Sequence, residues 1–365
     1  MKIFLCYRYH PHATALYFEK ALHQLGHEVY SIASSSRARS GYPGTQDLNA
    51  LISGGMPMPD LAMLVDPSGE FFPHGWEILD CPTAIYLIDV HIRIDLREML
   101  VPFFDYIFIA QLDYVDHFRR LGNPQTFWLP LACDPEIHGP RQFGKKWDIG
   151  FVGQVHSPNR ARYLQLLADK FKINDYHKYY PKEQIADVYS QSRIVFNNAI
   201  NGDLNMRVFE GLASGSLLVT ECIPNGQSDL FKHEEHLVEY SNDDELLKVV
   251  NYYLEHDTER ERIAHAGHKL VIAKHTYSQR CHFIIDTIFS DGQPQLKSLA
   301  RQFNSASLRS AYSRVYRKFL MMDAVLEELE LAWRCRQGYA GIFKDVIEVF
   351  VRSLYRTFRL PPKHK

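Results

Sequence analysis

Short apolar runs alternate with amphipathic segments over roughly the first third of the chain. Uninterrupted apolar stretches predict strands buried on both faces, and apolar residues spaced three or four apart predict helices. The predicted strands are residues 2–6, 27–33, 61–65, 83–89, 106–110 and 126–132. The predicted helices between them are residues 13–26, 94–100 and 113–122. This order predicts a parallel sheet with helices on both faces.

The same alternation returns in the second half of the chain. Its predicted strands are residues 148–153, 193–200 and 216–221, and its predicted helices are residues 157–171, 182–192, 206–214, 243–256, 259–275 and 278–289. The segment "CDPEIHGPRQFGKK" (133–146) holds Pro, Gly and charge without periodicity, which indicates an interdomain linker and hinge. The chain shows no tandem repeat of about 20–50 residues, which argues against a solenoid.

The predicted fold class is therefore α/β, with two doubly wound Rossmann-like domains facing a cleft and a helical C-terminal extension. The predicted domains are residues 1–135, 136–290 and 291–365. Open parallel sheets bind ligands beyond the carboxyl ends of their strands. The loops expected to line the cleft are those after Cys6, Val65, Asp89, Gly153 and Ile200.

Composition agrees with a folded protein of about two domains, since 46% of the 365 residues are hydrophobic and 23% are charged. The six cysteines lie far apart; four of them (6, 81, 222 and 281) adjoin apolar stretches, as reduced core thiols would. The N-terminal apolar run is interrupted by Tyr, Arg and His, so it predicts a first strand rather than a signal peptide. No window reaches the length of a membrane span. We therefore expect a cytoplasmic protein.

The formal net charge of −2 hides an asymmetry, because residues 301–365 carry 13 Lys/Arg against 6 Asp/Glu. Within this tail, the pattern of 343–362 places apolar residues on one side of a helix and Arg352, Arg356 and Arg359 on another. Such a helix could lie on an anionic membrane surface. It could equally pack its apolar stripe on the core or on a second subunit, which is the commoner outcome and the one we favour.

The segment "NGDLNMRVFEGLASGSLLVT" (201–220) carries the most specific chemistry. Asn205 is a favourable N-cap and Gly215 suits the residue just past the helix end. The amides that begin with Met206 would form an anion site, to which Arg207 adds a grip on phosphate oxygens. Glu210 lies one turn deeper, roughly 7 Å behind Asn205, where it could accept both hydroxyls of a ribose. The alternative is a plain Arg–Glu pair on a solvated helix.

This segment resembles the nucleotide-binding signature of GT-B glycosyltransferases, in particular "glycosyl transferases group 1" and CgeB-like proteins. Glu210, Gly211, Ala213 and Gly215 match that signature, and the resemblance extends over most of residues 1–290. It includes "ALHQLGHEV", "FDYIFIAQLDYVDHFRRLG", "WLPLACDPEIH", "WDIGFVGQV" and "HTYSQRCHFII". The resemblance implies that the Glu contacts the ribose and that the turn before the helix cradles the phosphates.

One position departs from the wider pattern. Group-1 enzymes have a second Glu eight residues before the ribose carboxylate, near the donor sugar; here that place is Gly202, followed by Asp203. The resemblance implies that Asp203 substitutes for that Glu or that the role is absent. It also implies that a His in the part of the N-terminal domain around His91 contacts the donor sugar, and that the reaction retains configuration.

Further candidates follow the predicted strands. Gly153 would let backbone approach phosphate, or would merely form a tight turn. Arg8 and His10, with His12, fill the loop after the first strand and could contact phosphate or an acidic acceptor, or stay solvated. The His-x-His spacing has no further ligand cluster beside it, so a metal is not expected.

An Asp–His pair follows the strand 83–89. Asp89 ends this strand and His91 lies two residues on, where the pair could supply a general base. Alternatively, Asp95 caps a helix and His91 bonds to backbone. Asp66 and Glu70 are weaker candidates in a Pro/Gly turn.

The functional prediction is a metal-independent glycosyltransferase with a nucleotide-diphosphate sugar as donor, an unknown acceptor and no cofactor. The chain lacks G-x-G-x-x-G and a phosphate-loop motif, which argues against a dinucleotide dehydrogenase and a P-loop ATPase. Two rivals remain: a sugar-nucleotide epimerase of the same fold and a non-catalytic coat or assembly protein. Nucleic acid is not an expected partner, whereas peripheral membrane contact or oligomerisation through the C-terminal helices would fit the basic tail.

Overall fold

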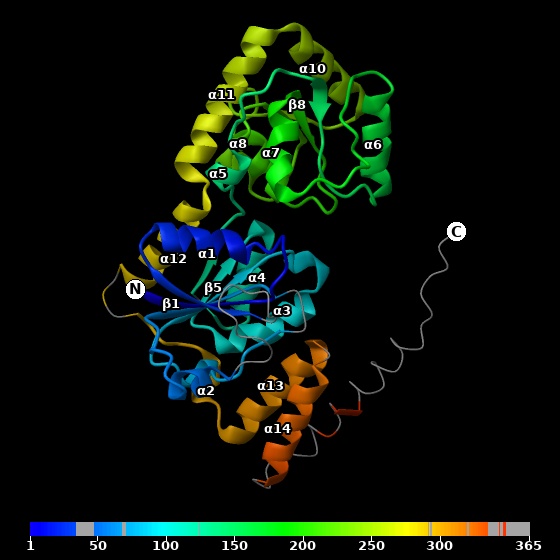
Figure 1. Cartoon of the computed structure of the whole chain (residues 1–365). Helices are drawn as coiled ribbons and strands as arrows, with labels where there is room; N and C mark the ends of the chain where they lie inside the picture. Colours follow the sequence, from blue (N-terminus) through cyan, green and yellow to red (C-terminus); the bar gives the residue numbers. More distant parts are fainter. Residues whose placement is uncertain are drawn as a thin grey trace. The chain divides into compact units, whose positions relative to one another are not determined.

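The computed structural model describes residues 1–33, 47–67, 71–123, 125–290, 292, 294–319, 321–334, 343 and 346–347. These residues form two compact units, each with its own parallel sheet (Figure 1). Unit 1 comprises Met1–Ile109, Tyr114–Trp128 and Ile284–Lys365, and unit 2 comprises Ala110–Asp113 and Leu129–Phe283. Unit 2 is therefore mainly one long insertion into the chain of unit 1.

The sheet of unit 1 has six strands in the order β2-β1-β3-β4-β5-β6, with every pairing parallel. Its strands are β1 Lys2–Tyr7, β2 Glu28–Ala33, β3 Leu61–Val65, β4 Thr83–Leu87, β5 Tyr106–Ile109 and β6 Thr126–Trp128. The α-helices along these segments are α1 Ala15–Gln24, α2 Leu48–Ser53, α3 Ile94–Leu100, α4 Val115–Arg120, α13 Ser305–Phe319 and α14 Met322–Arg334. The 3₁₀ helices are η1 Trp76–Ile78, η2 Val90–Ile92, η3 Val101–Phe103, η4 Leu112–Tyr114 and η5 Leu299–Gln302. The prediction of a doubly wound parallel sheet is confirmed in this unit.

Both faces of this sheet are covered, which explains why its strands read as continuous apolar runs. On one face the alternate residues Phe4, Ile85 and Ile107 belong to a buried cluster that also contains Tyr312 and Tyr316 of α13. On the other face Phe18 of α1 meets Tyr86, with ring centroids 5.1 Å apart. The period-2 alternation of a strand thus divides its side chains between two helical layers.

The C-terminal helices α13 and α14 belong to the core of unit 1, which differs from the predicted separate extension 291–365. Five side chains of α13 are buried in the cluster with the sheet, including Tyr312 at 0% exposure. Tyr312 accepts hydrogen bonds through its hydroxyl from Gly75 N (2.8 Å) and Trp76 N (3.1 Å). The predicted amphipathic helix of 343–362 lies almost wholly outside the described residues.

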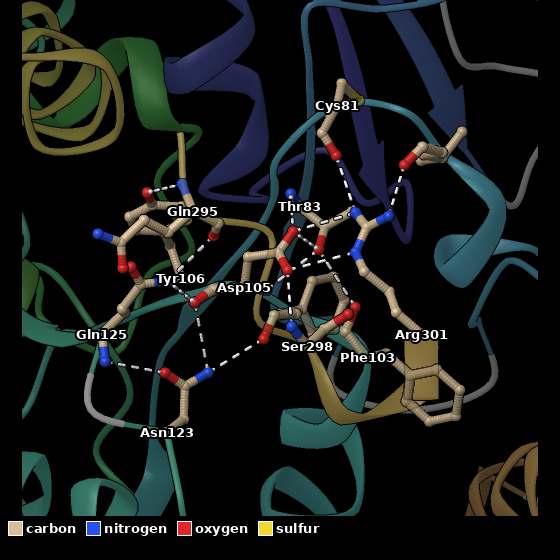
Figure 2. Close-up of polar contacts among 12 residues, drawn as sticks. Cys81, Thr83, Phe103, Asp105, Tyr106, Asn123, Gln125, Gln295, Ser298 and Arg301 are labelled. Atoms are coloured by element: carbon tan, nitrogen blue, oxygen red, sulfur yellow. Dashed lines mark hydrogen bonds and ion pairs between the residues drawn. The ribbon is translucent and has the colours of Figure 1, made fainter. Parts of the chain in front are cut away.

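A polar network at the amino ends of β4 and β5 fixes the segment that leads into α13 (Figure 2). Arg301 pairs with the fully buried Asp105 (3.1 Å) and donates to Leu79 O (2.6 Å) and Cys81 O (2.9 Å). Asp105 also accepts from Thr83 N (2.8 Å) and Ser298 N (2.7 Å). Because each charge is met by several partners, this buried ion pair ties the chain after unit 2 back to the strands before it.

The sheet of unit 2 has four parallel strands in the order β10-β9-β8-β7. The strands are β7 Trp147–Gly150, β8 Ser192–Asn197, β9 Leu217–Glu221 and β10 Val238–Tyr240. Its α-helices are α5 Pro135–His138, α6 Pro158–Ala168, α7 Lys182–Ser190, α8 Met206–Ala213, α9 Gln227–Leu230, α10 Asp243–Glu255 and α11 Asp257–Lys274, followed by α12 Tyr277–Phe289, which runs on into unit 1.

Helix α8 lies unusually close to its sheet because of one glycine. A Cβ at Gly211 would stand 3.0 Å from Leu218 Cδ1 and 3.1 Å from Val195 Cγ1, so a larger residue would push the helix away from β8 and β9. The opposite face carries Ile194 and Phe196 of β8 in a buried cluster with α6 and α10. The sheet thus holds α8 firmly, and with it the residues that the sequence singled out.

The predicted linker 133–146 is part of the scaffold of unit 2. Cys133 N donates to His275 O (3.0 Å), and Tyr277 N donates to Cys133 O (3.1 Å). The ammonium of Lys145 donates to Ser190 O (3.0 Å) and Ser192 O (2.7 Å). The chain passes between the units at 109/110, 113/114, 128/129 and 283/284 instead. The Pro and Gly residues of segment 133–146 shape turns within unit 2, so their presence did not mark a linker.

The cysteines follow the prediction with one exception. Cys6, Cys81, Cys133 and Cys281 are buried free thiols, whereas Cys222 is exposed because it lies just beyond the end of β9. Cys335 lies outside the described residues. No described helix combines the length and the apolarity needed to cross a bilayer.

Candidate active site

The carboxyl edge of the unit 2 sheet gathers the residues predicted to hold a nucleotide. All four strands run the same way, so their carboxyl ends share one edge. β7 is followed there by Phe151 and Gly153, β8 ends at Asn197, and β9 ends at Glu221. Helix α8 begins beyond the loop that follows β8. This is the place where open α/β sheets bind ligands.

Arg207, in the first turn of α8, is fixed at this edge. Its Nε donates to Val152 O (3.0 Å) and one terminal nitrogen donates to Asn197 Oδ1 (2.9 Å). The guanidinium also lies over the Phe151 ring, 4.3 Å from the centroid. These two hydrogen bonds, with a further one to Tyr189, engage part of the five N–H donors of the group. The charge of Arg207 is therefore held in one orientation next to the strand ends.

Gly153 makes room for this guanidinium. A Cβ at Gly153 would stand 2.1 Å from a terminal nitrogen of Arg207, and the glycine has φ +151°. The close approach excludes a larger side chain unless Arg207 shifts, and the backbone angle would strain one in any case. Besides forming a turn, the glycine therefore leaves space for the guanidinium of Arg207 at the end of β7.

A second arginine, Arg160 of α6, lies at the same edge and is only 5% exposed. Two of its nitrogens donate to Asn198 O (3.0 and 2.5 Å) and a third to Gln154 O (2.8 Å). Burial, and after it the charge of Arg207, lowers the pKa of Arg160 to about 10, so it stays cationic at neutral pH. Arg160 joins the loop after β7 to the end of β8 and adds positive charge there.

Two carboxylates partly balance these cations. Asp203 and Glu221 both act to raise the pKa of Arg160, against the effect of its burial. Glu221 accepts from Asn198 Nδ2 (2.7 Å) and from Ala199 N. Burial raises the pKa of Glu221 despite these bonds. Asp203 is buried in the loop before α8, and Gly202 beside it has φ +66° with open space around it.

The ends of α8 agree with the sequence in position. Asn205 has the extended backbone of an N-cap (φ −81°, ψ 168°), although its side chain makes no capping hydrogen bond. Gly215 takes the left-handed conformation (φ +75°) just past the helix, as predicted. The hydrogen bond from Val208 N to Asn205 O (3.2 Å) starts the helix. The amides of Met206 and Arg207 come before it, in the first turn, where amides have no partner within the helix. The start of α8 thus carries the partial positive charge of a helix N-terminus.

Glu210 does not pair with Arg207, so the alternative of a solvated Arg–Glu pair is wrong. Its side chain is only 11% exposed, and its Oε1 lies 3.6 Å from Nε2 of the fully buried His138. His138 accepts a hydrogen bond at Nδ1 from Asp134 N (3.0 Å). The carboxylate thus lies beside α5, one turn behind the start of α8.

Unit 1 holds the remaining candidates at the carboxyl edge of its own sheet. Asp66 forms a buried bidentate pair with Arg97 (2.9 and 3.3 Å) and accepts from Ile88 N (3.1 Å). It is therefore a structural residue that fixes the loop after β4. In that loop Asp89 is exposed and has a left-handed backbone (φ +51°), and His91 is half-buried. Glu70 lies outside the described residues.

Arg8, His10 and His12 are exposed in the loop after β1. His12 N donates to His10 Nδ1 (3.0 Å), which keeps the two rings together with centroids 5.5 Å apart. Over the described part of the chain, no group of three His, Cys, Asp or Glu side chains is arranged to hold a metal ion. The independence from metal stays a prediction.

Three residues of the unit 2 edge were not predicted, namely Arg160, Glu221 and His138. Glu221 ends a predicted strand at the carboxyl edge, so the criterion applied to Asp89 would have found it. Arg160 lies in the first turn of the helix after β7, where a basic residue is a recognisable signal. His138 has no local signal, because its role depends on a contact with a distant helix.

Comparison with known proteins agrees with this arrangement. Residues 136–286 match the sequence model of the family described as "Glycosyl transferase-like", a region that contains Gly153, Arg160, Arg207, Glu210 and Glu221. A search among curated proteins finds no match.

Solved structures resemble most of the chain at low sequence identity. A glycosyltransferase from Rickettsia africae has a TM-score of 0.54 at 10% identity, over 78% of this chain and 97% of its own. HepE from Anabaena, in complex with UDP-glucose, has a TM-score of 0.52 at 13% identity, over 80% and 100%. Sucrose-phosphate synthase from Thermosynechococcus elongatus has a TM-score of 0.52 at 10% identity, over 79% and 100%.

The narrower resemblance to CgeB-like proteins stays a prediction. At these identities the solved structures establish the fold alone, and the family model matches residues 136–286. The chain thus has the GT-B fold of glycosyltransferase structures, and its residues 136–286 match the family described as Glycosyl transferase-like.

Proposed function

We propose that this protein transfers a sugar from a nucleotide-diphosphate sugar to an acceptor. The observation that carries the proposal is the position of Arg207 and Glu210 on α8, at the carboxyl edge of the unit 2 sheet. The helix start and the donors of Arg207 that its internal bonds do not engage would hold the diphosphate. Glu210, one turn deeper, would accept hydrogen bonds from the two ribose hydroxyls.

The same groups would stabilise the leaving diphosphate. Negative charge develops on the departing phosphate during transfer, and a fixed guanidinium with a helix N-terminus can meet that charge. Gly153 would let backbone approach the phosphate beside Arg207, and Asn205 and Met206 would contribute the polar start of the helix. We accordingly propose a reaction that requires no metal ion.

Unit 1 would supply the acceptor side. Asp89 and His91 follow β4 and could provide an acid or base, and Arg8 and His10 follow β1 and would favour an anionic acceptor or phosphate. Asp203 would take the place of the second Glu of group-1 enzymes. The resemblance to those enzymes supports retention of configuration, and the free cysteines support a cytoplasmic site of action.

UDP-glucose is the first donor to test, because HepE, which shares this fold, has been solved in complex with UDP-glucose. The panel should also contain GDP-, dTDP- and ADP-sugars, since no described residue identifies the base. Release of free sugar or its transfer to an acceptor, measured by chromatography, supports the proposal. Interconversion of the sugar without release would indicate an epimerase instead.

Glu210→Ala tests the site directly. We expect the affinity for the nucleoside diphosphate to fall roughly tenfold or more, since each lost hydrogen bond to a charged group is worth about 1.5–3 kcal/mol. Glu183→Ala on α7, an exposed carboxylate, is the matched control and should bind normally. Wild-type affinity in Glu210→Ala would refute the assignment.

A second candidate, nucleotide binding without transfer, is favoured by Gly202. This glycine occupies the place of the second Glu and has a left-handed backbone (φ +66°), so a Glu there would be strained. Asp203, the neighbouring acid, is buried beside Arg160 rather than exposed. Donor binding without any hydrolysis or transfer, over a broad acceptor panel, would support this candidate.

A further inference from the structure

Inside unit 2 the charge of Glu210 acts on Cys133 and Tyr189, and its carboxylate faces His138 most directly. Glu210 Oε1 lies 3.6 Å from His138 Nε2, and the two side chains are 11% and 0% exposed. A buried carboxylate is costly unless a donor or an opposite charge compensates for the lost water. The histidine ring therefore bears on how Glu210 is oriented.

The tautomer of His138 follows from its other nitrogen. Asp134 N donates to Nδ1 (3.0 Å), so Nδ1 carries a lone pair and the proton of the neutral ring lies on Nε2. That proton is on the side of the ring that faces Glu210. At 3.6 Å the contact is longer than a hydrogen bond, but the N–H dipole still favours a carboxylate oxygen in this position.

The ring cannot easily withdraw from the carboxylate. Asp134 caps α5 by accepting from Glu136 N (2.9 Å), and His138 N donates to Asp134 O (2.8 Å). Gly139 closes the turn with a bond to Pro135 O (2.9 Å), where a Cβ would stand only 2.3 Å from that oxygen. The short helix and its histidine are thus held as one rigid piece against α8.

We propose that His138 is a positioning residue for Glu210, which keeps the carboxylate turned so that it can accept both ribose hydroxyls. The inference rests on the proposed function, because it concerns how Glu210 recognises the ribose. His138 acts through its Nε2–H on Glu210 and touches no part of the substrate. A histidine that merely fills the core would contribute to stability but not to recognition of the hydroxyls.

The test compares binding of UDP with binding of 2′-deoxy-UDP and 3′-deoxy-UDP by calorimetry. The ratio of affinities isolates the hydroxyl contacts, so a general loss of stability does not change it. We expect wild type to prefer UDP by roughly tenfold. Glu210→Ala should abolish the preference, with a ratio near one.

Two variants of His138 separate positioning from packing. His138→Asn keeps a group near Nδ1 but lacks a donor near Nε2, and should reduce the preference to about twofold. His138→Gln places an amide donor near the Nε2 position and should restore most of the preference. His268→Phe is the matched control: His268 Nδ1 lies 2.9 Å from Ala213 O at the far end of α8, and its loss should leave the ratio unchanged.

The outcomes distinguish the two proposals. A wild-type ratio in His138→Asn, with the ratio lost in Glu210→Ala, overturns the role of His138 and leaves the nucleotide site in place. An unchanged ratio in Glu210→Ala, or a wild-type protein that binds the three ligands equally, removes the ribose assignment and this inference with it. If His138→Asn fails to fold, His138→Phe, which also lacks a donor near Nε2, takes its place. A wild-type ratio in His138→Phe then overturns the role of His138, and a reduced ratio supports it.

Discussion

Replacement of Gly153 by alanine tests whether the proposed nucleotide binding at the carboxyl edge of the unit 2 sheet depends on the fixed position of Arg207. The new Cβ would stand 2.1 Å from a terminal nitrogen of Arg207 and 3.3 Å from its Cζ. No methyl group tolerates the first of these distances, so the guanidinium has to move. It can do so only by leaving Val152 O and Asn197 Oδ1, which it contacts at 3.0 and 2.9 Å.

The size of the effect follows from these contacts. Each hydrogen bond from a charged group contributes about 1.5–3 kcal/mol, part of which water restores when the half-buried group moves outward. The backbone at φ +151° adds strain of about 1 kcal/mol or more for any residue with a Cβ. We therefore expect the free energy of unfolding to fall by about 2–4 kcal/mol, and UDP to bind at least tenfold more weakly.

Gly215→Ala is the matched control for the backbone term. Gly215 is also left-handed (φ +75°), but a Cβ there would have its nearest neighbour at an ordinary 3.7 Å, on Pro140. This variant should lose about 1 kcal/mol of stability and keep its affinity for UDP. Thermal denaturation and calorimetric titration with UDP measure both quantities. The reasoning is refuted if the two alanine variants lose equal stability and Gly153→Ala binds UDP as wild type does.

Three further outcomes follow from the structure. Arg301→Ala leaves the buried Asp105 without its cation and should cost about 3–5 kcal/mol in urea denaturation; a loss below about 1 kcal/mol would contradict this. Burial and Arg280 lower the pKa of His275 to about 3, so wild type loses stability as the pH falls from about 6.5 to 3. His275→Gln should remove up to about 1.4 kcal/mol per pH unit of that loss. If the stability of this variant falls with pH as steeply as that of wild type, the ring is not held neutral in the folded protein. Asp89→Asn keeps a residue that tolerates φ +51° but removes the charge, and should lower kcat about 100-fold at unchanged UDP affinity; unaltered kcat would remove Asp89 from the catalytic candidates.

Elements of five residues or more could be predicted where buried strands and helices show a run or a period of apolar residues. The strand Leu61–Val65 and the helix Ile94–Leu100 were predicted with the bounds that the structure has. Val238–Tyr240 and Gln227–Leu230 were missed, since three or four residues are too few to show a period. Their conformations are set by neighbours that lie far away in the chain.

The site was predictable where it depends on strand ends and helix ends. Gly153 and Arg207 were both chosen for their positions after a strand and at a helix start, and the structure places them in contact. The contact of Glu210 with His138 could not be predicted, because it requires the return of a segment that composition marked as a linker. Arg160 could have been found from its place in the first turn of the helix after β7, but its bonds to the carbonyl of Asn198 could not.

The interrupted path of unit 1 has a consequence for synthesis on the ribosome. Its first strands emerge early, but the helix Ser305–Phe319 that covers one face of their sheet follows only after the whole of unit 2. At about 5–20 residues per second, that face waits on the order of 10–40 s for its cover. Unit 2, whose strands and helices are nearly contiguous, can complete its core during this interval, and the exposed sheet of the nascent chain is then the part of the protein most in need of a chaperone.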